Sequence, residues 1–534
     1  MQDQAFRKKS FIWQGAFVLT IAGIITKIMS AAYRVPYQNI VGDIGIYIYQ
    51  QVYPFYGMAI MLATSGFPVI VSKLISDHEE DGQSAIVNIL LLSFFFICGI
   101  GLLGFFILYF GAGPLAAYMG DIELKMLIQV VSFSFLLLPF ISIYRGYFQG
   151  KQEMLPTAIS QLTEQIIRVL TILLLSSWML ESGYGLYEAG AGALFGSLTG
   201  GFAAFSVLNL FWLRRKRSSP LSFNISSSSV TNSSILKQLF LYTVTICVSS
   251  LLLIFVQLVD ALSLYSLLIF NGMEEIAAKQ MKGIFDRGQP LIQLGTVVAA
   301  SLSLTLVPLI SSAKRKKNEA LIQEKVNLSL KVCLTIGIGA SAGLIAILEP
   351  VNIMLFTNNS GNNYLTILSV SILFTSLITT LTAILQGLND TIFPAIAVVA
   401  GVVIKYGLNQ LLVPQFAATG AALATVISFA AVALINVYLL RKKGYRLSDY
   451  RGIFVSLIGA AVMMITLKLY LAGFEFFIDT VHRGLAVIEA LSGVFIGAFV
   501  YGWVILKGKM FTEKELIGIP IGKQLIKRSQ RKEG

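Results

Sequence analysis

The sequence has few charged residues. Lysine, arginine, aspartate and glutamate make up 13% of its 534 residues, whereas a soluble globular protein of ordinary composition has about 25%. Apolar residues account for 56% of the chain, and the mean hydropathy is +0.77. This composition excludes an ordinary soluble domain and indicates a protein that lies within a membrane.

The sequence also has little that catalysis or a metal site would use. Its two histidines, His78 and His482, lie in separate polar stretches, and its three cysteines lie within apolar runs. The longest stretches without an apolar run, 214–234 and 507–534, are too short for a separate domain, since fewer than about 40 residues rarely form a stable core. No nucleophile–base constellation or Gly-rich nucleotide loop occurs in the sequence. We therefore expect no enzyme activity, no metal and no cofactor.

Long apolar runs are the main feature of the chain. Fourteen segments of about 20 residues follow one another, and each is long enough to cross a ~30 Å hydrocarbon core as a helix. The first covers residues 11–32 and the second 52–75. The sequence therefore predicts an all-α polytopic membrane protein with 14 transmembrane helices.

Lysine and arginine are concentrated in alternate loops of this arrangement. The clusters are 214–217, 314–317, 441–446 and 523–532. With the N-terminus inside, all of them lie on the inner side, as the positive-inside rule requires. We expect a multi-pass protein of the cytoplasmic membrane with both termini cytoplasmic. Its net charge of +13 is then explained by topology and attraction to anionic membrane lipid, without nucleic-acid binding.

The two halves of the chain are weakly similar. Gln149-Gly150 and Gln386-Gly387 are separated by 237 positions (386 − 149 = 237), and the same offset takes Arg168 to Lys405. Because this offset spans six helices, both halves cross the membrane in the same direction. Parallel repeats are typical of transporters that hold the substrate between two halves and work by alternating access. We therefore predict two parallel six-helix repeats around a central cavity, with two extra C-terminal helices.

This repeat defines the predicted domains. They are an N-lobe of spans one to six (1–213), a basic and Ser-rich cytoplasmic linker (214–234), a C-lobe of spans seven to twelve (235–440), spans thirteen and fourteen (441–506), and a basic cytoplasmic tail (507–534).

Several ionisable residues lie inside predicted spans, where each costs at least ~2.5 kcal/mol on insertion scales and needs a reason. Span one carries Lys27 and Arg34, which are seven residues apart and so face the same side of a helix. Span five carries Glu164 and Arg168, whose spacing of four residues allows a direct ion pair. We favour such a self-satisfied pair over a ligand site, and we keep both residues as candidates for a role in the cavity or in coupling.

The other deep residues are Asp260, Asp286, Arg287 and Lys405, so that five cations face three anions in total. A polar cavity with surplus positive charge suits an anionic substrate, and phosphate is the group that arginine binds best. A structural explanation stays open for Arg34 and Arg287, because side chains near an interface can extend to the headgroups.

These features resemble the multidrug/oligosaccharidyl-lipid/polysaccharide (MOP) exporter superfamily. Residues 65–73 (Ser-Gly-Phe-Pro-Val-Ile-Val-Ser-Lys) and 285–291 (Phe-Asp-Arg-Gly-Gln-Pro-Leu) are similar to the branch of polysaccharide transporters and stage V sporulation protein B, which is related to lipid II flippases. The resemblance covers nearly the whole chain.

The resemblance implies a flippase. Such a protein moves an undecaprenyl-pyrophosphate-linked saccharide from the inner to the outer leaflet, for cell-wall or polysaccharide biosynthesis. It implies substrate-binding roles for Lys27, Arg34, Asp286 and Arg287, and a lipid-tail groove at spans thirteen and fourteen. An arginine that the group carries in span two has no counterpart here.

The resemblance also implies a cation site in the second half of the chain. In these flippases it uses an aspartate of span seven and polar residues of span eleven, which Asp260 and Asn409 match. Lys405 stands four residues before Asn409, and its ammonium can take the place of a bound sodium ion. We therefore expect an Asp260–Lys405 pair and no sodium requirement at this site. Coupling to the membrane potential, to H⁺ or to Na⁺ is left open by the sequence.

Two other functions stay open. A cation-coupled multidrug exporter of the same superfamily would favour acidic residues in its cavity, whereas span one presents Lys27 and Arg34. A membrane scaffold without transport would bind envelope-synthesis proteins.

Overall fold

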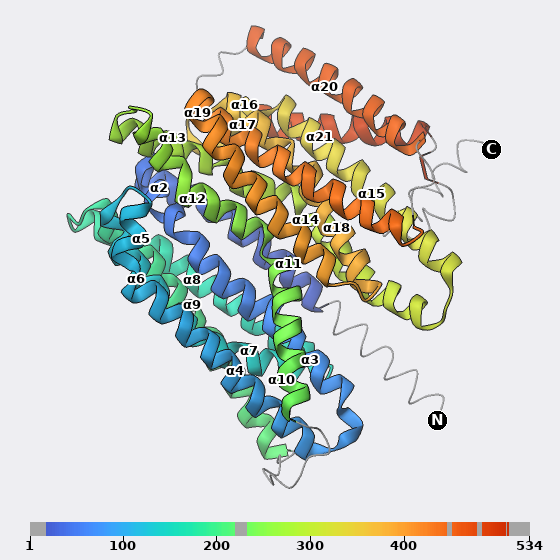
Figure 1. Ribbon diagram of the computed structural model, residues 1–534. Coiled ribbons are helices and arrows are strands. Elements are labelled where there is room, and N and C mark those ends of the chain that lie inside the picture. Colours follow the sequence, from blue (N-terminus) through green and yellow to red (C-terminus); the bar gives the residue numbers. More distant parts are fainter. Residues whose placement is uncertain (1–17, 219–231, 446–450, 478–482, 509, 512–534) are drawn as a thin grey trace. The chain divides into compact units, whose positions relative to one another are not determined.

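The computed structural model describes residues 18–218, 232–445, 451–477, 483–508 and 510–511. Within these ranges the protein is built of helices and contains no β-strand (Figure 1). The chain divides into two compact units. Unit 1 comprises Met1–Leu294 and Thr391–Ser428, and unit 2 comprises Gly295–Asp390 and Phe429–Gly534. The predicted lobe boundaries stay a prediction.

Unit 1 contains the following helices, all of which lie within residues 18–286. They are the helical residues 18–32, α2 (Arg34–Met61), the π-helix η1 (Leu62–Gly66), α3 (Phe67–Asp77), η2 (Glu79–Asp81), α4 (Gln83–Phe110), α5 (Ala112–Tyr118), η3 (Ile122–Leu124), α6 (Lys125–Ser132), α7 (Ser134–Gly150), α8 (Met154–Glu181), α9 (Leu186–Ser218), α10 (Asn232–Tyr242), the π-helix η4 (Thr243–Cys247), α11 (Val248–Ser250), α12 (Leu252–Phe270) and α13 (Glu275–Asp286).

Unit 2 contains helices of the second half. They are α15 (Glu319–Ala346), α16 (Leu348–Phe356), α17 (Asn362–Ser369), α18 (Ser371–Gly387), α20 (Arg451–Phe477) and α21 (Arg483–Lys507). Two helices contribute residues to both units, namely α14 (Gly288–Arg315) and α19 (Ile392–Lys442).

Eleven helical segments of the described residues are long and apolar enough to cross a membrane. Two of these, Val18–Asp77 and Ile392–Lys442, contain 60 and 51 residues, although about 20 suffice for one crossing. Each contains a residue of positive φ at which the backbone leaves the helical conformation, Gly42 (φ 72°) in the first and Ala417 (φ 48°) in the second. The chain is therefore a multi-pass membrane protein, and the count of fourteen spans stays a prediction.

The second span begins earlier than the sequence predicts. The apolar run suggests a start near residue 52, whereas α2 continues directly from the break at Gly42. The intervening segment carries Asp43, Gln50 and Gln51, which lower its hydropathy. Gln50 and Gln51 are nevertheless buried, and the Gln51 amide donates to the carbonyl of Ala261 at 3.1 Å. Polar residues that lie buried or half-buried inside the protein therefore lower the hydropathy at the start of this helix, so the apolar run begins later than the helix does.

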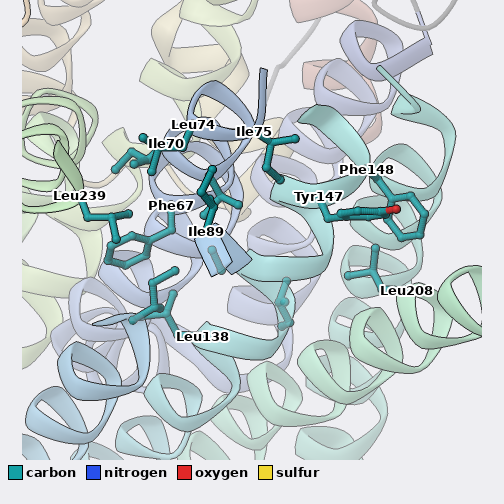
Figure 2. Close-up of a cluster of buried hydrophobic side chains, with 14 of the residues drawn as sticks. Phe67, Ile70, Leu74, Ile75, Ile89, Leu138, Tyr147, Phe148, Leu208 and Leu239 are labelled. Atoms are coloured by element: carbon teal, nitrogen blue, oxygen red, sulfur yellow. The ribbon is translucent and has the colours of Figure 1, made fainter. Parts of the chain in front are cut away.

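A buried apolar cluster holds several helices of unit 1 together. Figure 2 shows members of this cluster on α3, α4, α7, α9 and α10: Phe67, Ile70, Leu74, Ile89, Leu138, Tyr147, Phe148, Leu208 and Leu239. A Cβ added to Gly146 on α7 would lie 2.6 Å from Cβ of Val71 on α3. Because lipid tails are as apolar as the core, close packing of this kind stabilises helix pairs in a membrane.

Helices α8 and α9 pack against each other through small residues of α9. A Cβ on Gly196 would lie 3.0 Å from the carbonyl oxygen of Arg168, and one on Gly200 would lie 2.8 Å from that of Glu164. The hydroxyls of Thr171 and Thr199 lie 2.8 Å apart across the same interface. This contact fixes the part of α8 that carries the two charged residues.

The turns that follow Gln149-Gly150 and Gln386-Gly387, which we call the Gln-Gly turns, have the same local structure in the two halves. Gln152 and Asn389, which the predicted offset relates, both have positive φ, 61° and 58°. In each turn the N–H of the next residue, Glu153 or Asp390, donates to the carbonyl five residues earlier, at 2.8 and 2.9 Å. The glycines match as well, since a Cβ on Gly150 or Gly387 would lie 2.9 Å from an isoleucine of a neighbouring helix. The repeat detected in the sequence therefore extends to backbone geometry.

Candidate functional site

Arg34 is the first residue of α2 and follows a turn at Tyr33. Its side chain is 1% exposed, and its guanidinium carbon lies 4.6 Å from the centre of the Tyr53 ring. None of its three guanidinium nitrogens has a hydrogen-bond partner, and it makes no ion pair, among the described residues. The aromatic ring attracts this cation but does not neutralise it.

Arg168 on α8 is a second buried guanidinium, 2% exposed, in the same unit. Its Nη1 donates to the Tyr56 hydroxyl at 2.8 Å and its Nη2 to the Ser30 hydroxyl at 3.5 Å. Its guanidinium carbon lies 5.7 Å from the centre of the Tyr33 ring, and its Nε has no partner. All of these contacts are with neutral groups, so the positive charge of Arg168 is not compensated by them.

Five tyrosines form a connected set of rings that includes those in contact with the two guanidinium groups, and we call them the tyrosine cluster: Tyr33, Tyr37, Tyr49, Tyr53 and Tyr56. Their neighbouring ring centres lie between 5.0 and 6.4 Å apart. Tyr49, Tyr53 and Tyr56 share one face of α2 because they are spaced by four and three residues. The Tyr33 and Tyr49 hydroxyls are hydrogen-bonded at 2.8 Å. The cluster thus supplies aromatic faces and hydroxyls but no anion.

The predicted ion pair between Glu164 and Arg168 is wrong. Glu164 instead accepts from Nη2 of Arg145 on α7, with 2.7 Å between Nη2 and Oε2. The other Arg145 nitrogens donate to the Ser160 hydroxyl at 3.1 Å and the Ala63 carbonyl at 3.2 Å. Arg145 is therefore fully partnered. The only sequence signal for it is an arginine inside the fourth predicted span.

Lys27 lies in the helical residues 18–32, and its side chain is exposed. Ile21, Ile25 and Ile28 on the same helix are exposed too, as expected for a face that contacts lipid. Because an α-helix turns by about 100° per residue, Lys27 lies roughly 120° around the helix from this apolar face. Lys27 makes no hydrogen bond or ion pair within the described part of the chain.

Arg287 and Asp286 are both paired. Nη2 of Arg287 lies 2.7 Å from Oδ1 of Asp43, which also accepts from the Gln38 amide at 2.5 Å. Asp286 contacts the ammonium of Lys282, one helical turn earlier, at 2.6 Å. Nothing in the sequence spacing indicates Asp43 as a partner of Arg287, since the two are 244 residues apart.

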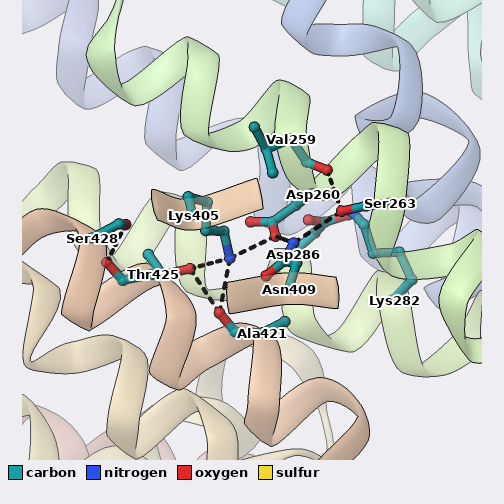
Figure 3. Close-up of polar contacts among 10 residues, drawn as sticks. All are labelled: Val259, Asp260, Ser263, Lys282, Asp286, Lys405, Asn409, Ala421, Thr425 and Ser428. Carbon is teal, nitrogen blue, oxygen red and sulfur yellow. Dashed lines mark hydrogen bonds and ion pairs between the residues drawn. The ribbon is translucent and has the colours of Figure 1, made fainter. Parts of the chain in front are cut away.

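Lys405 and Asp260 form the expected ion pair, with 2.7 Å between Nζ and Oδ1. The Lys405 ammonium also donates to the Ala421 carbonyl at 2.9 Å and the Thr425 hydroxyl at 2.7 Å (Figure 3). The Asn409 amide donates to Asp260 at 3.0 Å. A carboxylate, a carbonyl and a hydroxyl oxygen thus surround a fully buried ammonium, which is 0% exposed.

A further polar cluster centres on Asp121, before η3. Its carboxylate accepts from the Tyr47 and Tyr187 hydroxyls at 3.0 and 2.6 Å, and Lys279 on α13 lies 3.6 Å away. Lys279 also donates to the exposed Glu275, and this hydrogen bond lowers the pKa of the Glu275 carboxyl. All of these groups have partners, so the cluster joins α13 to the first half of the chain.

Ion pairing separates the predicted cations into two groups. Arg287 and Lys405 have a carboxylate partner, whereas Lys27, Arg34 and Arg168 make no ion pair among the residues that the structure describes. The surplus of positive charge that the sequence predicts therefore resides in the first half of the chain. The roles assigned to these residues, and the central cavity, stay predictions.

Comparison with known proteins identifies the family. Residues 12–314 match the polysaccharide biosynthesis protein family, and residues 245–411 match the MatE family. The chain is 52% identical to the membrane protein YabM of Bacillus subtilis (strain 168) over 534 residues, 100% of this chain and 99% of YabM. It is 30% identical to the lipid II flippase MurJ of the same organism over 523 residues, 92% of this chain and 94% of MurJ. The chain belongs to the polysaccharide biosynthesis protein family, within the MOP exporter superfamily.

Solved structures agree with this assignment at the level of the fold. An inward-facing MATE family transporter of the MOP superfamily superimposes with a TM-score of 0.64 at 15% identity, over 80% of this chain and 98% of that one. Lipid II flippase MurJ in an inward closed conformation gives a TM-score of 0.58 at 17% identity, over 92% and 97%. The protein is a transporter of the MOP superfamily.

Proposed function

We propose that the protein is a flippase for an undecaprenyl-pyrophosphate-linked saccharide. It moves this lipid from the inner to the outer leaflet of the cytoplasmic membrane by alternating access, with both termini cytoplasmic and without enzymatic chemistry. The observation that carries the proposal is the pair of buried guanidinium groups, Arg34 and Arg168, that make no ion pair within the described residues. A buried cation in a membrane protein needs a reason, and phosphate is the anion whose geometry guanidinium matches best.

The direction of transport is compatible with the membrane potential. Moving negative charge outward across an inside-negative membrane is favourable by ~2.3 kcal/mol per charge for each 100 mV. The similarity to lipid II flippase MurJ supports a lipid-linked substrate. In this mechanism the polar head group passes along the cations while the lipid tail stays in the bilayer.

The second half supplies a cation of its own. The Lys405 ammonium is held by oxygens of Asp260, Ala421 and Thr425, which are the ligand types that a hard metal cation takes. We propose that this ammonium fills the place of a coupling cation and that transport needs no sodium at this position.

A multidrug exporter is the second candidate, because the MatE match and the MATE structure favour it. An exporter of organic cations needs an acidic group that is free to bind them. Asp260 and Asp286 are each paired with a lysine, which favours the flippase.

Expression in cells depleted of their own lipid II flippase tests the proposal. We expect the chain to restore growth, and Arg34→Gln to abolish this rescue with the variant still present in the membrane. Growth that the chain does not restore, together with export of a fluorescent organic cation from the same cells, would establish the exporter instead.

A further inference from the structure

The two unpaired guanidinium groups lie in one connected set of aromatic rings. Arg34 lies over Tyr53, and Arg168 donates to the hydroxyl of Tyr56. The ring centres of Tyr53 and Tyr56 are 6.0 Å apart. No carboxylate pairs with either arginine among the described residues. The cluster therefore links two buried cations through adjoining rings, and burial without a carboxylate partner is unfavourable for each of them unless an anion binds there.

We propose that Arg34 and Arg168 bind the two phosphates of a diphosphate, one guanidinium on each, and that Arg168 makes the protein select diphosphate-linked lipids over monophosphate-linked lipids. This inference rests on the proposed function and assigns the selectivity to one residue.

The hydrogen-bonding state of the two arginines fits this role. All three nitrogens of Arg34 lack partners, so its planar fork is available for two parallel bonds to one phosphate. Arg168 has a free Nε, and its other donors contact the neutral hydroxyls of Tyr56 and Ser30. A phosphate oxygen replaces such neutral acceptors with a stronger, charge-assisted hydrogen bond.

The tyrosine cluster contributes further donors. The Tyr37 hydroxyl is buried and has no hydrogen-bond partner. The Tyr56 hydroxyl, which accepts from Arg168, has its own O–H to donate. Both are available to phosphate oxygens that no guanidinium reaches.

Selectivity follows from the cost of leaving one arginine without its anion. A monophosphate satisfies one guanidinium and leaves the other buried and unpaired. A site built to hydrogen-bond a group discriminates strongly against an analogue that lacks it, since the buried polar partner is then left unsatisfied. The other buried arginines do not compete, because Arg145 and Arg287 already contact carboxylates.

Lipid binding to the purified full-length chain tests the inference. The probes are undecaprenyl diphosphate and undecaprenyl monophosphate, and their dissociation constants are compared by native mass spectrometry. We expect the wild type to prefer the diphosphate by about tenfold or more, and Arg168→Gln to lose about tenfold for the diphosphate and less than about twofold for the monophosphate. The preference then disappears.

Lys73→Gln provides a matched control. Lys73 is another cation that a tyrosine holds, since its Nζ donates to Tyr242 at 2.9 Å and lies 4.0 Å from the ring centre. It lies outside the tyrosine cluster, so its loss should lower both affinities equally or not at all and keep the preference. Arg168→Lys keeps the charge without the fork, and we expect it to lose most of the preference as well, which provides a second variant if Arg168→Gln does not fold.

The outcomes separate this inference from the proposed function. A wild type that binds neither lipid contradicts the proposed function itself. A wild type that binds both lipids equally, or an Arg168→Gln variant that keeps the diphosphate preference, overturns the inference and leaves a lipid-linked substrate in place.

Discussion

Arg168 in the first half and Lys405 in the second half stand at equivalent positions of the internal repeat, and their surroundings differ. Arg168 contacts the hydroxyls of Tyr56 and Ser30 and no carboxylate among the described residues. Lys405 contacts the Asp260 carboxylate together with two neutral oxygens. The two equivalent positions therefore both carry a positive charge. Among the described residues, only Lys405 in the second half has a carboxylate partner.

This difference assigns the two cations different tasks. A buried charge whose neighbours are all neutral has lost its hydration without gaining a counter-ion. An anionic substrate can supply that counter-ion. A buried charge with a carboxylate and two further oxygens is satisfied within the protein. Under the proposed function, the cation of the first half therefore binds a phosphate of the substrate, whereas the cation of the second half is satisfied by the protein's own oxygens.

The largest expected effect comes from breaking the pair of the second half. Lys405→Met leaves Asp260 buried without its ammonium, and we expect it to lower the free energy of unfolding by ~3–5 kcal/mol. The double variant Lys405→Met/Asp260→Asn removes both charges, and we expect it to recover to within about 1 kcal/mol of the wild type, since neutral replacement of a buried pair costs little. Thermal unfolding in detergent measures both. Equal stability of the single and double variants would show that the pair is not coupled.

The equivalent change in the first half should affect transport and not stability. Arg168→Gln removes a charge that no carboxylate compensates, so we expect the free energy of unfolding to stay within about 1 kcal/mol of the wild type. The initial rate of flipping of a fluorescent lipid-linked saccharide in proteoliposomes should fall by about tenfold or more. A loss of stability as large as that of Lys405→Met would mean that Arg168 is structural.

The sequence alone predicts that Arg168 and Lys405 lie at equivalent positions in two helices. It predicts the partner of Lys405 but not the partners of Arg168. The repeat relates residue 168 to residue 405, and the Asp260–Lys405 pair is present as expected. The spacing of Glu164 and Arg168 shows that two side chains on one helix can meet, yet it carries no information about a better partner on another helix. Arg145, from α7, takes Glu164 instead.

The fold was predictable where residues are apolar and less so where buried residues are polar. Apolar runs identify the helices correctly as membrane-spanning. The start of the second span is missed because Asp43, Gln50 and Gln51 are polar. Two of these residues have a partner far along the chain, since Gln51 donates to Ala261 and Asp43 pairs with Arg287. Contacts at such separations depend on the tertiary arrangement, which one sequence does not display.

The two Gln-Gly turns offer a smaller test of the repeat. Gln152 and Asn389 both adopt positive φ at exposed positions, which costs a glutamine more than an asparagine. We expect Gln152→Gly to raise the free energy of unfolding by ~0.5 kcal/mol after the entropy cost of glycine, and Asn389→Gly to change it less. Thermal unfolding of the two variants measures the difference, and a larger gain from Asn389→Gly would contradict the strain argument.

The smallest expected effect is that of sodium. Because the Lys405 ammonium already contacts the carboxylate, carbonyl and hydroxyl oxygens that a sodium ion would need, replacing sodium with choline should change the flipping rate of the wild type by less than about twofold, once ionic strength is held constant. Lys405→Ala empties this position and leaves the Asp260 carboxylate, so its stability should rise with added sodium, whereas that of the wild type should not. Flipping by the wild type that stops without sodium would show that a cation binds elsewhere or that the ammonium leaves Asp260 during transport, and either result would end the assignment of Lys405 as the internal cation.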